Sequence, residues 1–483
     1  MTLRFYDTAT ASVRDFIPVH EGQARLYYCG ATVQGGPHIG HIRSALVFDV
    51  LTRWLRFRGY RVTSVRNVTD IDDKILANSA ASFERNYGGD HAQEQWWALA
   101  YRCEKIFTAA YSALGIEDPT YEPRATGHIP QMHALISELI SAGHAYPAAD
   151  GSGDVYFDVH SWPRYGELTH QRVEDMQDAA DADPRGKRDP RDFALWKGHK
   201  HTDPQTAAWD SPWGPGRPGW HVECSAMAGR YLGDRFDIHG GGLDLRFPHH
   251  ENELAQSAAA GRGFANFWLH NGMVTYQGEK MSKSVGNTIS PERMLEQARP
   301  LAVRYYLGQA QYRSVLDYRP TSLAEATAAI ERVETFLKIA QNSGVDLAWK
   351  PDDLPLAFAE AMDDDLNVPK ALSALHESVR AGNTALNAAP HPGQGTDETA
   401  RHARAVAAMT EILGLRQLMD IDSAISGGGE HAALDHLVQD LLERRAKARL
   451  QKDWAEADRL RDTLTAAGIQ VADGADGSTW NLG

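Results

Sequence analysis

The chain has 483 residues and a formal net charge of −15, with 49 Lys and Arg against 64 Asp and Glu. Its hydrophobic fraction of 42% and charged fraction of 23% are those of a globular protein, and the length suffices for three or four domains. This acidic balance excludes a generally basic nucleic-acid binder, so any RNA surface must be a local basic patch.

Residues 1–25 lack the apolar core of a signal peptide, and we find no membrane-length apolar run. The three cysteines, Cys29, Cys103 and Cys224, lie far apart and make no disulfide framework. We therefore expect a cytoplasmic protein without a membrane partner.

The first elements predict a doubly wound α/β fold. A short buried strand at Leu26–Cys29 precedes the loop Pro37–His41, and apolar residues at three- and four-residue spacing predict a helix over Gly40–Arg58. A second strand follows at Val62–Asn67. Strand, turn, helix and strand are typical of a Rossmann-like parallel sheet, and they place His38 and His41 at a helix N-terminus that favours an anion.

The stretch Asn67–Lys74 contains an N-cap candidate and three acids, so helix capping and ligand binding explain it equally well, with Thr69 as the ligand contact. A helix is predicted over 87–115, and its expected packing residues are Trp96, Trp97, Tyr101 and Phe107. Cys103 in this helix is interpreted as a buried structural thiol.

Residues 118–200 are interpreted as an inserted subdomain with a hairpin around Val155–Phe157 and a long charged loop at Asp178–Asp192. Within it Arg124 could contact RNA, although a surface ion pair explains it better. A strand at Phe236–His239 then runs into Gly240–Gly242 and Asp244, where glycines permit close approach of a ligand and the carboxylate could accept a ribose hydroxyl.

A candidate metal site combines residues from three places. We expect Pro248 to begin a helix in which His249 and Glu253, four residues apart, share one face, whereas His250 would pair with Leu254. Cys29 and Cys224 would complete a tetrahedral zinc site. The spacing fits no zinc finger, and a capping His–Glu pair with two buried thiols is the alternative.

A strand is expected at 267–274 and helices over 291–340. After the polar linker Asn342–Pro355, helices are predicted at Ala357–Leu386 and Ala400–Leu415. Beyond the glycines of Ser423–Glu430 comes a helix pair, about 431–450 and 453–467, that ends at Gly468, then a short strand and a terminal turn with Trp480. Glu443–Arg461 carries seven Lys/Arg and four Asp/Glu, which suits either a solvated helix face or an RNA contact.

The motifs His38-Ile39-Gly40-His41 and Lys280-Met281-Ser282-Lys283-Ser284, in this order, resemble the HIGH and KMSKS signatures of class I aminoacyl-tRNA synthetases. With Tyr28–Gly30, Asn67–Lys74, Gly219–Met227 and Phe236–Glu253, nearly the whole chain resembles the cysteinyl-tRNA synthetase family. The alternative interpretation of these two motifs is a helix-capping loop and a solvated lysine loop.

The resemblance implies L-cysteine, ATP and tRNA(Cys) as partners, one Zn²⁺ per chain, Mg²⁺ with ATP, and a monomer. It implies zinc ligands Cys29, Cys224, His249 and Glu253 and a cysteine pocket of Cys29, Gly30, Thr69, Trp220 and His239. Catalysis would fall to His38, His41, Lys280 and Lys283, and ATP would contact Gly40, His41, Gly242, Asp244, Lys280, Ser282 and Lys283.

The expected organisation is a Rossmann-like catalytic domain at 1–117 and 201–275 with the insertion at 118–200 between its halves. A KMSKS and stem-contact region at 276–350, a helical anticodon-binding domain at 351–420 and a helix-pair domain at 430–483 follow. Two other functions compete: a ligase that joins cysteine to an amino sugar, which lacks a long anticodon-binding tail, and a non-catalytic RNA-binding paralogue, which the intact motifs oppose.

Overall fold

A four-stranded parallel sheet, in the order β10–β9–β3–β4, forms the centre of the N-terminal part. Its strands are β3 (Gln23–Tyr28), β4 (Arg61–Arg66), β9 (Arg235–Gly242) and β10 (Phe264–Asn271). The computed structural model describes residues 2–176, 186–281, 288–389, 395–419, 430–474 and 477–482. The predicted Rossmann-like parallel sheet is confirmed, except that the strand expected at 267–274 is two strands, because β11 (Val274–Tyr276) starts a different sheet.

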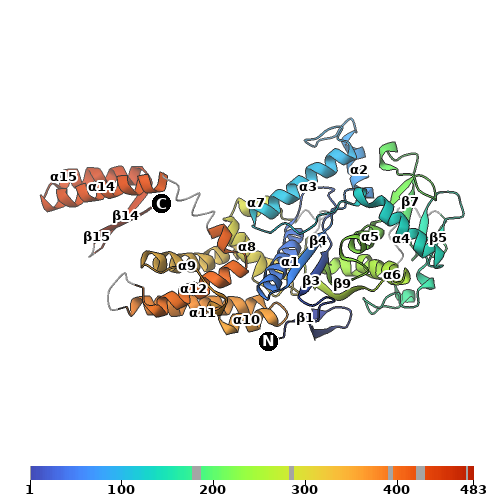
Figure 1. Ribbon diagram of the computed structural model, residues 1–483. Helices are drawn as coiled ribbons and strands as arrows, with labels where there is room; N and C mark the ends of the chain where they lie inside the picture. The colour runs from blue at the N-terminus through green and yellow to red at the C-terminus, as the bar shows by residue number, and fades with distance from the viewer. Residues whose placement is uncertain are drawn as a thin grey trace. The chain divides into compact units, whose positions relative to one another are not determined.

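Helices cover both faces of this sheet. Figure 1 shows α1 (Ile39–Phe57) on one side of β3 and β9, and α5 (Trp220–Leu232) with α6 (Glu251–Ala259) on the other. Close packing requires glycine at Gly240, because a Cβ there would lie 2.2 Å from the ring of Phe48 on α1. The glycine run at 240 thus serves helix–sheet packing at its first position.

The region between β4 and β9 begins with α2 (Asp73–Ser82) and α3 (Trp96–Ala113). The helix expected over 87–115 begins only at Trp96, so the prediction of helix for residues 87–95 was wrong. Cys103 is buried as expected, but Trp97 and Tyr101 are 46% and 55% exposed. They lie four residues apart on the stripe opposite the buried one, so their expected packing role was wrong.

The inserted part contains α4 (Ile129–Ser141) and an antiparallel sheet in the order β5–β6–β7–β8. Its strands are β5 (Ala145–Pro147), β6 (Val155–Phe157), β7 (Phe193–Gly198) and β8 (Gly216–Pro218). The hairpin expected around Val155–Phe157 is present, and the sheet extends beyond residue 200 because β8 pairs with β7.

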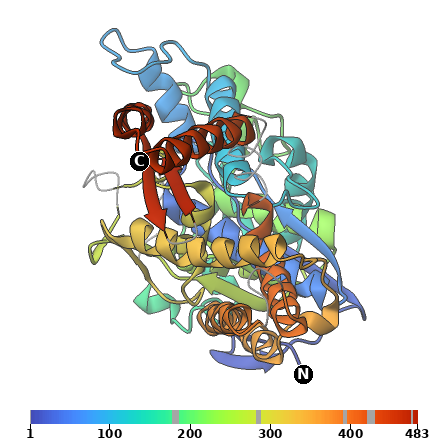
Figure 2. The same cartoon turned by 90° about the vertical axis from the view of Figure 1, so that its left-hand side faces the viewer.

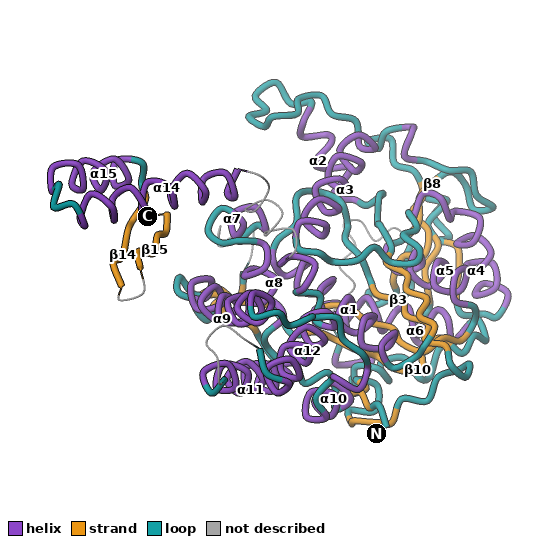
Figure 3. The backbone as a smooth tube through the Cα atoms, turned by 60° about the vertical axis from the view of Figure 1, so that its left-hand side comes forward, coloured by secondary structure: helices purple, strands orange, loops and turns teal. Residues whose placement is uncertain are grey.

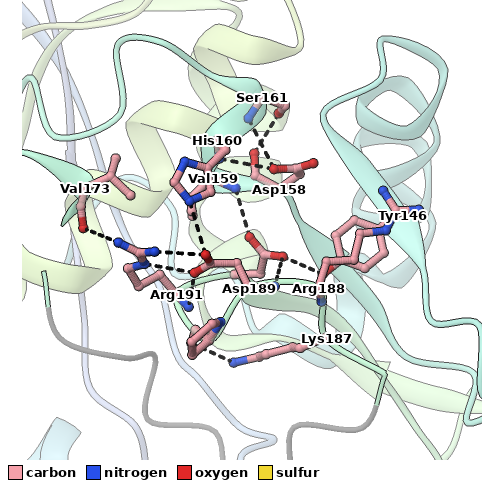
Figure 4. Close-up of polar contacts among 12 residues, drawn as sticks. Tyr146, Asp158, Val159, His160, Ser161, Val173, Lys187, Arg188, Asp189 and Arg191 are labelled. Atoms are coloured by element: carbon pink, nitrogen blue, oxygen red, sulfur yellow. Dashed lines mark hydrogen bonds and ion pairs between the residues drawn. The ribbon is translucent and has the colours of Figure 1, made fainter.

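A polar cluster holds the end of the charged loop against this sheet (Figure 4). Asp192, fully buried, accepts hydrogen bonds from the Tyr146 hydroxyl and the Val159 amide. Asp189 lies within hydrogen-bonding distance of His160 and pairs with Arg191, which also donates to the Val173 carbonyl. The described C-terminal part of this expected charged loop is therefore fixed in place; residues 177–185 lie outside the described ones.

A small sheet in the order β12–β11–β13 follows the central one, with β12 at Glu279–Lys280 and β13 at Leu316–Tyr318. Strand β11 pairs antiparallel with β12 and parallel with β13. The region 291–340 was expected to be helical throughout, but strand β13 interrupts it. Strands β1 (Arg4–Asp7) and β2 (Ser12–Asp15) form a separate hairpin.

Helices make up the rest of this unit, which spans Met1–Arg416. They are α7 (Pro291–Leu295), α8 (Pro300–Gly308), α9 (Ser322–Asn342), α10 (Leu356–Asp363), α11 (Val368–Asn387) and α12 (Asp397–Ile412). Figure 2 shows α9, α11 and α12 packed side by side. The single helix expected at 357–386 is broken at Asp365 and Leu366, whose φ angles of 58° and 48° are incompatible with an α-helix.

The second unit, Gln417–Gly483, contains the expected helix pair α14 (Glu430–Leu450) and α15 (Trp454–Ala466), followed by a hairpin (Figure 3). Gly468, with φ of 77°, ends α15 as predicted. Trp480 lies in strand β15 (Gly477–Leu482), which pairs with β14 (Ile469–Gly474), so the expected terminal turn was wrong. Its indole donates to Asp435 and closes a core of Val438, Leu442, Leu464 and Ile469. In the described part of the chain, no helix has the length and apolar character that crossing a membrane demands.

Candidate active site

The N-terminus of α1 is held by its own histidines. Gly40 N donates to His38 Nδ1 at 3.1 Å, His38 N donates to His41 Nδ1 at 3.2 Å, and the two rings stack with centroids 3.7 Å apart. A Cβ at Gly40 would lie 2.8 Å from the His38 ring, so glycine lets the ring fold over the helix end. Because each Nδ1 accepts, each neutral ring carries its proton on Nε2 as a donor.

The chain near the second motif comes close to this helix end. Ile39 N, at the start of α1, donates to the Ile289 carbonyl at 3.0 Å. Lys280 lies in β12 opposite Thr275, whereas Ser282 and Lys283 fall outside the described residues. The segment that follows the second motif therefore lies against the N-terminus of α1, which carries the first motif.

Four predicted ligands gather between β3, α5 and α6. Cys29 Sγ lies 3.8 Å from Cys224 Sγ and 3.5 Å from Glu253 Oε1, and His249 Nε2 lies 3.1 Å from the same oxygen. Their donor atoms all lie within 4.8 Å of one another and could hold a metal ion. Burial raises the pKa of both thiols. A bound cation would oppose that effect, because a coordinated thiol loses its proton.

His249 is oriented for this arrangement by neighbours on α5. Its Nδ1 lies 2.9 Å from His221 Nδ1, and its ring stacks on Trp220 with centroids 4.2 Å apart. Burial lowers the pKa of His221 to about 3, so a neutral ring faces His249. A hydrogen bond at Nδ1 leaves Nε2 directed at Glu253, as a metal-binding imidazole requires.

Further histidines extend the cluster: His239, which was expected in the cysteine pocket, and His250, which was not expected in the site. His239 Nε2 lies 2.8 Å from Glu253 Oε2, and His250 Nε2 lies 4.0 Å from Glu253 Oε1, a proximity that the expected pairing of His250 with Leu254 did not include. His250 and Glu253 are three residues apart, and residues at this spacing also share a helix face. A π-helical turn, Arg246–His250, precedes α6 and has extended backbone angles at Phe247. Cys29, His239, His250 and Glu253 form a second possible ligand set.

Behind this cluster, His250 Nδ1 lies 2.8 Å from His270 Nε2, and His270 Nδ1 lies 2.8 Å from Thr8 Oγ1. These contacts join α6 to β10 and to the segment after β1. Nothing in the local spacing of the sequence links these residues.

Thr69, the expected substrate contact, lies at the end of β4 beside the cluster. Its hydroxyl donates to the buried Glu223 at 2.9 Å, and Glu223 precedes the ligand candidate Cys224. Gly30 N donates to Asn67 Oδ1 at 2.9 Å, and a Cβ at Gly30 would overlap the Asn67 carbonyl at 1.8 Å. The ends of β3 and β4 therefore approach each other closely at the expected cysteine pocket. Glu223 was not predicted from the sequence as a member of this pocket.

Asp72, in the stretch that follows Thr69, does cap a helix, because its carboxylate accepts from Lys74 N at 2.8 Å at the start of α2. Asp73 forms ion pairs with Lys197 and Arg217 of the inserted sheet. Beyond β9, Asp244 is exposed, and a Cβ at Gly242 would lie 2.4 Å from its Oδ1. Contact of Gly242 and Asp244 with ATP stays a prediction.

Comparison with known families gives a single assignment along the chain. The model described as tRNA synthetases class I (C) catalytic domain matches residues 15–328, the DALR domain 357–417, and the cysteinyl-tRNA ligase anticodon binding domain 431–480. A cysteine–tRNA ligase of Kocuria rhizophila is 72% identical with full coverage of both chains, and one of Micrococcus luteus is 66% identical with the same coverage.

Among solved structures, a Mycobacterium tuberculosis methionyl-tRNA synthetase in complex with methionyl-adenylate is similar at 16% identity and a TM-score of 0.54, covering 82% of this chain and 90% of that one. That likeness shows a shared fold. From the family models and the full-length relatives, the chain belongs to the cysteine–tRNA ligase family.

Proposed function

We propose that this chain activates L-cysteine with ATP and transfers the cysteinyl group to the 3′ end of tRNA(Cys). The observation that carries the proposal is the buried cluster of Cys29, Cys224, His249 and Glu253 in a chain 72% identical to a cysteine–tRNA ligase. The anticodon-binding match at 431–480 favours tRNA over an amino sugar as acceptor.

The donor set fits one zinc ion. Two thiolates, an imidazole and a carboxylate are ligands that zinc accepts in tetrahedral sites. Of the two possible sets, we favour the one with Cys224, because it has two soft sulfur donors, and because His239 already contacts the other oxygen of Glu253. Zinc held there would accept the substrate thiolate as a further soft ligand, which a serine hydroxyl replaces poorly.

The chain's own residues would bind and orient the reactants. In the first step a carboxylate oxygen of cysteine attacks the α-phosphorus of ATP, the bond to the bridging oxygen breaks, and pyrophosphate leaves. His38 and His41 would supply N–H donors at the helix N-terminus, and Lys280 and Lys283 would supply positive charge where negative charge grows. Mg²⁺ would enter with ATP.

Thr69 and Trp220 border the cluster and would orient the bound cysteine. Thr69 is fixed by its hydrogen bond to Glu223, and Trp220 by its stacking on His249. We also propose a monomer that acts in a reducing cytoplasm, the latter because all three cysteines are free thiols.

Two assays test the proposal. ATP–pyrophosphate exchange with L-cysteine and L-serine should proceed only with cysteine, and labelled cysteine should then appear on total tRNA. Transfer to glucosaminyl-inositol in place of tRNA would identify the amino-sugar ligase, and absence of exchange would favour a non-catalytic paralogue.

A further inference from the structure

Arg43 is a buried arginine two residues after the His38–His41 motif, on the first turns of α1. Only 1% of the Arg43 surface is exposed. The guanidinium donates to five backbone carbonyls: Gly272 and Met273 at 2.9 Å each, Gln311 at 3.3 Å, Tyr312 at 3.5 Å and Ser314 at 2.7 Å. One side chain of α1 thus holds two chain segments that are about 40 residues apart in sequence.

These two segments are the roots of β11 and β13. Gly272 and Met273 join β10 to β11, and 311–314 leads into β13. Gly272 N donates to the Tyr312 carbonyl at 2.7 Å, and Leu316 N donates to the Met273 carbonyl at 3.0 Å. The guanidinium therefore fixes the place where the small sheet starts, relative to α1.

From this root, hydrogen bonds continue to Lys280. Strand β11 turns through Gln277 and Gly278 into β12, where the Lys280 backbone pairs with Thr275. Asp317 on β13 accepts from the Thr275 hydroxyl at 2.8 Å and from Gly278 N at 2.7 Å. The hairpin that carries Lys280 is therefore braced to β13 and, through the root, to Arg43.

Burial of the charged Arg43 guanidinium costs free energy, so its presence here indicates that the geometry it fixes is needed. Burial lowers the pKa of Arg43 to about 10, and its guanidinium donates to neutral backbone carbonyls. A planar guanidinium can serve acceptors on two segments at once, which the single ammonium of lysine cannot do with the same directions.

Arg304 on α8 offers a natural comparison. It is equally buried at 1% exposure, but it pairs with the Asp49 carboxylate at 2.5 Å and donates to the carbonyls of Leu114, Gly115 and Leu413. It joins α1, α8 and α12, and among the described residues its hydrogen bonds do not reach the small sheet. Both arginines stabilise the same unit, but only Arg43 connects the two motif-bearing elements.

We propose that Arg43 is a positioning residue for adenylate formation, which sets the β11–β12 hairpin carrying Lys280 at its working distance from the α1 N-terminus carrying His38 and His41. This inference rests on the proposed function. Its consequence is that a change at Arg43 acts on the chemical step, since the groups that stabilise the transition state come from both elements.

Arg43→Lys and the matched control Arg304→Lys test the proposal in the full-length enzyme. We expect Arg43→Lys to lower kcat of pyrophosphate exchange by about 10- to 100-fold, the effect of a small misplacement of catalytic groups. KM for cysteine and the zinc content should stay near the wild-type values. Arg304→Lys should lower the melting temperature but leave kcat within about threefold of wild type.

Gly272→Ala is a second variant that leaves Arg43 in place. Its Cβ would lie 2.3 Å from the Ser314 carbonyl and 2.6 Å from that of Arg313, so the root must shift. We expect the same loss of kcat, and the double variant with Arg43→Lys should lose less than the product of the two single effects.

Folded Arg43→Lys and Gly272→Ala enzymes with wild-type kcat would overturn the inference, as would an equal loss of kcat in Arg304→Lys. If Arg43→Lys does not fold, kcat of Gly272→Ala decides alone. Absence of cysteine-dependent exchange in the wild type would count against the proposed function, whereas normal exchange in the variants counts against the role of Arg43 alone.

Discussion

The buried cluster around Glu253 and the exposed helix pair α14–α15 use charge in opposite ways. Glu253 is 0% exposed and lies against Cys29, His239 and His249, so each group depends on the others. On α15, Arg459 and Arg461 are more than half exposed, with partners Glu456 and Asp458 at 2.7 and 3.2 Å on the same helix. Exposed pairs contribute little individually, whereas the loss of one buried partner leaves the rest uncompensated.

This difference predicts how each region responds to substitution. A single change should abolish the function of the cluster, whereas the helix pair should lose affinity gradually as charges are removed. The following four changes, from the largest expected effect to the smallest, test that contrast.

Cys224→Ser should remove the zinc that we propose for this cluster and lower cysteine-dependent exchange by about 10,000-fold, the scale of discrimination in a site built around one specific contact. Metal analysis and exchange assays on the purified protein measure both. Cys103→Ser is the matched control, since Cys103 is also 1% exposed but lies in α3, outside the cluster. Unchanged zinc in Cys224→Ser would remove this residue from the ligand set.

Lys283→Ala should lower kcat of exchange by about 100- to 1,000-fold, because a positive charge is needed when negative charge grows on the phosphates. KM for cysteine should change little. Lys370→Ala, an exposed lysine on α11, serves as the control. Near-normal exchange in Lys283→Ala would mean that the second motif is not catalytic here.

Deletion of residues 431–483 should leave cysteine-dependent exchange largely intact, because every proposed zinc and ATP residue precedes 285. Charging of tRNA should fall on the order of 100-fold in kcat/KM, mainly through KM, as phosphate contacts are lost. A truncated enzyme that charges tRNA like the full chain would deny this region a tRNA role and return attention to the amino-sugar ligase.

Lys447→Gln on α14 should have the smallest effect. If Lys447, which is exposed, contacts a tRNA phosphate, the slope of log affinity against log salt should become shallower by about one, with exchange unchanged. Lys370→Gln provides the control for a general loss of charge. Identical salt slopes for wild type and Lys447→Gln would exclude a phosphate contact at this position.

Much of the catalytic region could be predicted because its signals are local. The four-residue spacing of His249 and Glu253 predicted a contact that is present at 3.1 Å. The parallel sheet and α1 followed from strand and helix periodicity. The family, the ligase class and the helical C-terminal region, all expected from the motifs, are confirmed by the comparisons.

What could not be predicted depends on contacts between distant segments. His221 reaches His249 from α5, and His270 reaches His250 from β10, so no local pattern could reveal them. Asp365 breaks the expected long helix because its carboxylate accepts from Tyr6 N and the Tyr312 hydroxyl, contacts that exist only in the folded chain. Zinc, the nucleotide contacts and the domain limits stay predictions.

The most direct test of the central claim compares cysteine with serine in pyrophosphate exchange, before and after metal removal and after zinc is restored. We predict that the native enzyme activates cysteine and excludes serine, that the metal-free enzyme activates neither efficiently, and that zinc restores the cysteine reaction alone. A metal-free enzyme that activates cysteine and rejects serine as the native enzyme does would contradict the claim that the buried cluster selects the substrate through a bound metal.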